Sequence, residues 1–95
     1  MCTYTTVHAA MTGSGKGPGS RWFTVTDATV YYDHPVHAMA EHTLNIDITD
    51  PSAGPGARIA LELDAASARR LAAAIHDALA AAPAELTAEP TPALT

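Results

Sequence analysis

Two short segments of the chain alternate between apolar and polar residues, and this alternation constrains the fold more than any other feature. They are HTLNIDITD at 42–50 and ARIALELD at 57–64. A period of two places alternate side chains on one face of a β-strand. The intervening PSAGPG at 51–56 consists of turn residues, so we predict a hairpin with one apolar face. That face carries Leu44, Ile46, Ile48, Ile59, Leu61 and Leu63.

The second alternating segment is followed by a segment with helical periodicity. DAASARRLAAAIHDALAAAP begins with Asp64, a favourable N-cap residue, and ends before Pro83. Leu71, Ile75 and Leu79 recur every four residues and form a narrow apolar stripe, which alanines widen. We expect this helix to pack across one face of the sheet.

A first strand and a glycine-rich loop are predicted near the N-terminus. CTYTTVHAAM at 2–11 is rich in β-branched residues and has no helical period. TGSGKGPGS at 12–20 is typical of a flexible hairpin loop. Its Gly15 and Lys16 invite comparison with a phosphate-binding P-loop, but the required glycine five positions earlier and the Ser or Thr directly afterwards are missing.

A second strand is predicted over RWFTVTDATVYYD at 21–33. The apolar residues change parity within it, because Phe23 and Val30 are seven positions apart. A β-bulge near Asp27 would restore all of them to one face and bend the strand. The alternative is a hairpin turned at 26–28, where no Gly or Asn favours a turn. We prefer the bulged strand.

These segments together predict an α+β fold. It is an antiparallel β-meander of four strands, or five if the second is split, with one C-terminal helix packed on one face. Residues 1–82 would form this single domain, and the Pro/Ala/Thr-rich residues 83–95 a disordered tail. One helix covers only part of four strands, and a core rich in alanine buries little area. A homodimer would cover the remaining apolar surface.

The charge and cysteine content exclude several classes of partner. The net charge is −5, and the 5 basic residues form no stripe, which argues against nucleic acid and anionic membrane surfaces. No apolar run is long enough to span a membrane. A single cysteine, Cys2, allows no intramolecular disulfide and fits a reducing compartment. We therefore expect a soluble, cytoplasmic protein.

Three of the five histidines fall within nine residues of YYDHPVHAMAEHTLNID at 31–47, namely His34, His37 and His42. With the bulge, His34 and His42 share a sheet face at the ends of neighbouring strands. Cβ atoms directly opposite in such a pair lie about 4.5–5.5 Å apart. Two imidazoles at this separation can share a metal ion, and His37 in the connecting loop could fold back as a third ligand.

A fourth group would complete or orient this three-histidine site. Glu41, Asp33 or Cys2 could supply a further ligand or hydrogen-bond a ring. Cys2 and His8 lie roughly 20 Å apart along the first strand, so at most one of them can join, and antiparallel pairing favours Cys2. We expect a divalent transition metal, zinc first and copper, iron or nickel as alternatives. An open coordination position could activate water, which leaves open whether the protein is an enzyme.

Other interpretations of the same residues stay open. The histidines could form a solvated loop without a role, or a pH sensor. A metal-free dimeric module could bind a small-molecule ligand or a protein through the exposed sheet face that holds Trp22, Tyr31 and Asn45. A Cys2–His34 pair could act as a nucleophile.

The segments DATVYYDHPVHAMAEHTLNID and ARIALELDAASARRLAAAI resemble a family of small uncharacterised actinobacterial proteins. The resemblance spans about residues 2–82. A preference for Arg over Lys and abundant Ala, Gly and Pro also fit a GC-rich genome. The resemblance implies a bacterial, single-domain, stand-alone protein, and it carries no activity, cofactor or catalytic residue.

Overall fold

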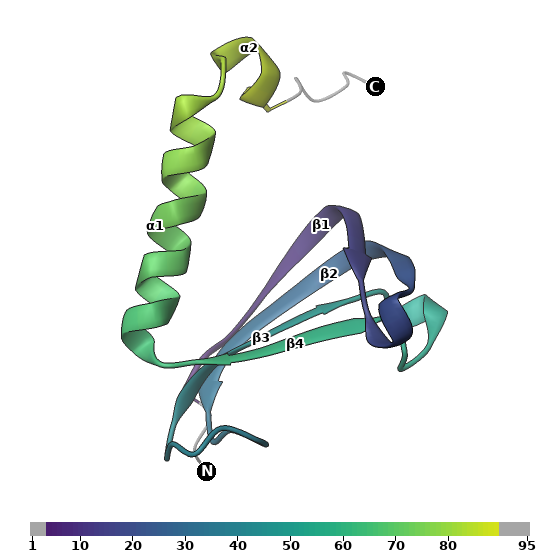
Figure 1. The fold of residues 1–95 in the computed structure, drawn as a ribbon, viewed down its shortest axis with the longest axis vertical. Coiled ribbons are helices and arrows are strands. Elements are labelled where there is room, and N and C mark those ends of the chain that lie inside the picture. The colour runs from purple at the N-terminus through teal and green to yellow at the C-terminus, as the bar shows by residue number, and fades with distance from the viewer. Residues whose placement is uncertain (1–3, 90–95) are drawn as a thin grey trace. The chain divides into compact units, whose positions relative to one another are not determined.

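A computed structural model of the chain describes residues 4–89. The strands form one open antiparallel sheet in the order β1-β2-β3-β4, and helices follow it, so the predicted α+β meander is confirmed (Figure 1). The chain divides into two compact units, residues 1–65 with the sheet and residues 66–95 with most of the helical segment. The elements are β1 Thr6–Lys16, β2 Trp22–Asp33, β3 Thr43–Thr49, β4 Arg58–Leu63, α1 Ala65–Ala81 and α2 Ala84–Thr87.

Cross-strand pairing gives the sheet one apolar and one polar face. Val7 pairs with Val30, Val30 with Ile46, and Ile46 with Leu61, so one apolar row crosses all four strands. Residues paired across an antiparallel ladder share a face, and their chain neighbours take the other. The opposite, polar face carries Thr29, Tyr31, Asn45, Asp47, Arg58 and Glu62.

The bulge predicted in the second strand near Asp27 is found on the opposite strand, in the pairing of β1 with β2. The register shifts between the pair Ala10–Asp27 and the pair Gly13–Val25, which is three steps on β1 against two on β2. The extra residue therefore lies on β1. Val25 and Ala28, which are three positions apart on β2, are both only 6% exposed.

Strand β1 continues through most of the predicted glycine-rich loop. Gly15 pairs with Phe23, and the turn itself is a short 3₁₀ segment at Pro18–Ser20. Gly15 is buried, and a Cβ atom there would lie 2.9 Å from Cδ1 of Ile59. Glycine at this position lets the backbone of β1 approach the core side chains closely, which explains why a loop-like sequence forms a strand here.

The most deeply buried side chains of residues 4–89 are polar. Thr43 is 2% and Asn45 5% exposed, whereas Val25, Ala28 and Ala57 are the apolar residues at 6%. Both polar residues belong to the polar face of β3. They are buried because the loop at 34–42 folds back over that face instead of extending away from the sheet.

The helical unit matches the prediction closely. Helix α1 spans Ala65–Ala81 where residues 64–82 were expected, and the short helix α2 follows Pro83. The stripe on α1 is exposed, at 39% for Leu71, 52% for Ile75 and 53% for Leu79. Packing of this helix on the sheet stays a prediction, as do the domain at 1–82 and the disordered tail, of which residues 90–95 lie outside the described part. No helix within residues 4–89 has both the length and the apolar character needed to cross a membrane.

Candidate functional site

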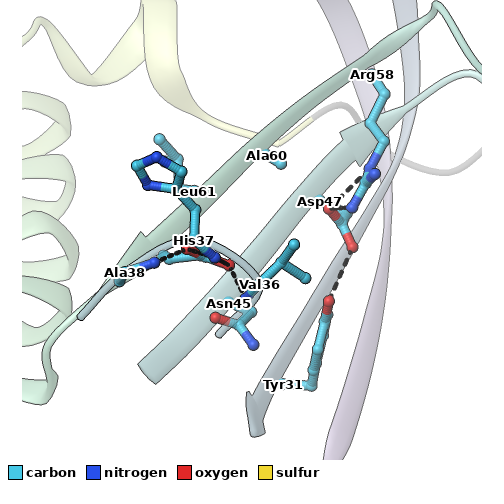
Figure 2. Close-up of a pocket in the computed structure, with 10 residues that line it drawn as sticks. Tyr31, Val36, His37, Ala38, Asn45, Asp47, Arg58, Ala60 and Leu61 are labelled. Atoms are coloured by element: carbon cyan, nitrogen blue, oxygen red, sulfur yellow. Dashed lines mark hydrogen bonds and ion pairs between the residues drawn. The ribbon is translucent and has the colours of Figure 1, made fainter. Parts of the chain in front are cut away.

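A hollow of about 490 Å³ opens on the polar face of the sheet, between strands β2 to β4 and the loop at 34–42 (Figure 2). Small-molecule sites commonly have volumes of about 300–1,000 Å³. Apolar and polar side chains contribute to its walls. It is lined by Tyr31, Val36, His37, Ala38, Asn45, Asp47, Arg58, Ala60, Leu61 and Glu62.

One side of the hollow is held by a bonded trio centred on Asp47. Nε and Nη2 of Arg58 donate to Oδ1 of Asp47 at 3.0 and 2.6 Å. The hydroxyl of Tyr31 donates to Oδ2 at 3.3 Å. Figure 2 shows the three side chains in a row over strands β2 to β4. Partial burial, and secondarily the Asp47 charge, raise the pKa of Tyr31, while the bond to Asp47 raises the pKa of Arg58.

The opposite side is held by Glu62, whose carboxylate receives consecutive backbone N–H groups of the loop. Ala38 donates to Oε1 at 2.8 Å and Val36 to Oε2 at 2.5 Å, and the N–H of His37 lies 3.0 and 3.2 Å from the two oxygens. These bonds, that from Ala38 most, lower the pKa of Glu62. Glu62 therefore fixes the loop to β4 and gives the hollow its wall.

Asn45 lines the hollow, and only one of its two side-chain polar atoms is hydrogen-bonded within residues 4–89. Its Oδ1 accepts a 2.6 Å bond from the hydroxyl of Thr43. Its Nδ2 makes no hydrogen bond with any group of residues 4–89, although the residue is only 5% exposed. No fully enclosed side-chain N or O atom in the described part lacks a partner, so this nitrogen is not fully enclosed, and its residue lines the hollow.

The predicted proximity of His34 and His42 is confirmed, but the two rings are not arranged as metal ligands. Their rings stack with centroids 4.6 Å apart and planes 27° apart, and His42 also stacks on Tyr32 at 5.7 Å. Nδ1 of His34 donates to the backbone carbonyl of Glu41 at 2.7 Å. The lone pairs of an imidazole lie in the ring plane, so two stacked rings do not direct theirs to a common point.

The predicted three-histidine metal function is therefore wrong. His37 lines the hollow on the polar face, whereas His42 stacks on Tyr32 at the other face. Within residues 4–89 no group of three or more His, Cys, Asp or Glu could hold a metal ion. The structure pairs Glu41 through its backbone rather than as a ligand, and Cys2 lies outside the described residues.

The alternative site residues fare differently from one another. Tyr31 and Asn45, predicted on the exposed sheet face, do line the hollow, whereas Trp22 does not and is 66% exposed beside Lys16. Sequence reasoning missed Arg58 and Glu62. Strand alternation could have identified them, because both are outward-facing residues of the last strand, and Glu62 pairs with Asn45.

Comparison with known proteins gives one family and no characterised relative. No curated protein and no solved structure matches the chain. Residues 1–88 match a protein family that is described as a family of unknown function. The resemblance noted in the sequence is confirmed, while the actinobacterial origin stays a prediction. The chain belongs to the family of unknown function DUF6295.

Proposed function

We propose that the protein is a binding module that holds a small organic molecule in the hollow on its polar face. The observation that carries this proposal is Asn45, a residue that is only 5% exposed and lines the hollow, and whose amide nitrogen has no bond within residues 4–89. A ligand that covered this nitrogen without bonding to it would leave a buried polar group without a partner, which costs roughly 1–3 kcal/mol. A ligand with a hydrogen-bond acceptor at this point would avoid that cost.

The other polar groups of the hollow suit holding a ligand better than transforming one. The carboxylate of Asp47 is occupied by Arg58 and Tyr31, and that of Glu62 by the loop. A carboxylate engaged in this way is a poor general base, and a tyrosine with a raised pKa is a poor nucleophile near neutral pH. Binding is therefore the function that these contacts support.

We also propose that the apolar face of the sheet pairs with a second copy of the chain. Val7 on β1 is 56% and Leu61 on β4 40% exposed, although both belong to the apolar row. Four strands spaced about 4.8 Å apart make a face about 19 Å wide, whereas one helix is about 10 Å across. Helix α1 alone is too narrow to cover that face, and a self-complementary apolar surface is what a two-fold homodimer requires.

Ligand binding is tested by titrating isotope-labelled protein with a fragment library in ¹H–¹⁵N correlation spectra. We expect saturable shifts at the backbone amides around the hollow, at 36–38, 45 and 60–62. Ala60→Phe should abolish them, because residue 60 lines the hollow and points to the polar face. Ala53→Phe, in the exposed turn Pro51–Ala53, should leave them unchanged. Absence of saturable shifts at these amides would overturn the proposal.

Dimer formation is tested by sedimentation equilibrium of the full chain. Val7→Glu should weaken the dimer roughly 100-fold, because each of two copies loses roughly 1.5 kcal/mol of apolar burial. Thr6→Glu is the matched control, since residue 6 lies on the same strand and points to the other face. A monomeric wild-type chain, or equal weakening by both variants, would show that the apolar face is not the interface.

A further inference from the structure

The groups still free in the hollow restrict the chemistry of its ligand, an inference that rests on the proposed function. A guanidinium has five N–H bonds, and Arg58 uses two of them on Asp47. The Asn45 amide nitrogen contributes further donors. Both residues therefore present N–H groups, and a ligand must meet them with oxygen or nitrogen acceptors.

Acceptors on the protein side of the hollow are already in use. A carboxylate offers about four lone-pair sites. Glu62 fills its sites with the N–H groups of the loop, and Asp47 fills most of its own with Arg58 and Tyr31. A ligand rich in donors, such as an ammonium compound, would lose its bonds to water and find few replacements.

The charge of the hollow argues against an anion. Two carboxylates, Asp47 and Glu62, line it together with one guanidinium, Arg58, and the whole chain carries a net charge of −5. A ligand carboxylate would enter a site with an excess of negative charge. An uncharged carbonyl offers the same acceptor geometry without that repulsion.

The spacing and the walls complete the description. Asn45 and Asp47 are two positions apart on β3, so their side chains stand about 7 Å apart along the strand, and Arg58 is bonded above the second. Val36 and Ala60 supply apolar contact. We infer that the hollow takes an uncharged molecule with two amide-like carbonyls and an apolar side group, one carbonyl on Asn45 and the other on Arg58.

Three probes test this inference. They are N-acetyl-leucinamide (neutral, two carbonyls), N-acetyl-leucine (an anion of the same skeleton) and leucinamide, which lacks the acetyl carbonyl and is a cation at pH about 6.5, since α-amino groups titrate near 7.7–8.0. In ¹H–¹⁵N titrations we expect N-acetyl-leucinamide to shift the Asn45 side-chain amide saturably. The two charged probes should bind at least about tenfold more weakly, a difference of about 1.4 kcal/mol.

Variants keep the outcome interpretable. Asn45→Asp removes the free donor and should weaken N-acetyl-leucinamide about tenfold or more. Ala60→Phe fills the hollow without touching Asn45, and should abolish binding even if the first variant folds poorly. Equal or tighter binding of a charged probe would overturn the neutral class while leaving the proposed function intact. No binding of any probe, with a positive fragment screen, would do the same; a negative screen removes both.

Discussion

Arg58 on β4 holds Asp47 on β3 through two N–H groups that share one carboxylate oxygen, at 3.0 and 2.6 Å. The side chains are 51% and 19% exposed, so solvent screens the pair, and its contribution to stability is at most about 1 kcal/mol. Its importance is positional. The pair occupies acceptor sites of Asp47 and fixes the guanidinium at one side of the hollow.

The pair should be visible in the titration of Tyr31. Asp47→Asn removes the charge that raises the Tyr31 pKa, so that pKa should fall, yet stay above 10 because burial is the larger cause. Arg58→Gln removes a group that lowers the same pKa and should raise it. Ultraviolet difference titration measures both, with Tyr31→Phe to identify the signal. Shifts in the same direction in both variants would contradict this assignment.

The raised Tyr31 pKa also predicts how stability changes at alkaline pH. The folded chain holds the phenol proton more tightly than the unfolded chain does. The stability from this group is therefore complete below about pH 10 and is lost as the pH rises through the folded pKa. Denaturant unfolding of Tyr31→Phe should show a smaller alkaline loss than wild type. An identical loss in the two proteins would mean that Tyr31 is not responsible.

Glu62 should make the loop at 34–42 sensitive to acid. Because its folded pKa is lowered, the carboxylate favours the folded loop above its ordinary value of 4.5, and this support is lost as the pH falls through the folded pKa. Hydrogen-exchange protection of Val36, His37 and Ala38 should therefore fall as the pH drops through the folded pKa, which lies below 4.5. Glu62→Gln should lower the protection near neutral pH and remove most of its dependence on acid.

The matched control for the loop is Glu41→Gln. Glu41 lies in the same loop, and the structure bonds its backbone carbonyl, which the substitution retains. If Glu41→Gln reduces protection as much as Glu62→Gln does, anchoring of the loop by Glu62 is wrong.

A pair of glycines on β1 tests the close approach to the core. A Cβ at Gly15 would lie 2.9 Å from Ile59 and 3.2 Å from Val25, whereas one at Gly13 would meet nothing within 4 Å. Gly15→Ala should lower the free energy of unfolding by about 1 kcal/mol through overpacking. Gly13→Ala should be neutral or stabilising by up to about 1 kcal/mol. Chemical denaturation checks both, and equal effects would exclude the close approach.

The buried bond between Thr43 and Asn45 gives a further prediction. Thr43→Val keeps the shape but leaves Oδ1 of Asn45 without its partner, which should cost about 1–3 kcal/mol of unfolding free energy. Thr43→Ser retains the hydroxyl and should cost less. Thermal and denaturant unfolding distinguish them; a Ser variant that is the less stable of the two would indicate that packing, not the bond, is what matters.

The strands and the long helix could be predicted because local pattern determines them. Strict alternation placed β3 and β4 within one or two residues, and the four-residue period placed α1. Strand β1 was harder, since the glycines at its end signal a loop. Gly15 nevertheless pairs as part of the strand, and its missing Cβ leaves the space that Ile59 and Val25 occupy.

The candidate site could be predicted only in part. Tyr31 and Asn45 follow from strand parity, and the approach of His34 to His42 follows from the hairpin. The path of the loop could not be predicted in this way, because it depends on three backbone N–H groups that donate to one carboxylate, Glu62, which lies 24–26 positions away in the chain. No sequence period records such a contact. The stacked orientation of the His34 and His42 rings argues against a shared metal ion, and strand parity alone does not predict ring orientation.

The meander order of the sheet has a kinetic consequence. Each strand pairs with the strand next to it in the chain, so no long crossover must close before pairing begins. Pairing between strands that follow each other in the chain gives a lower contact order than pairing across long connections, and a lower contact order is associated with faster folding. Each hairpin can therefore assemble on the one before it, from β1 to β4, while the rest of the chain is still being synthesised.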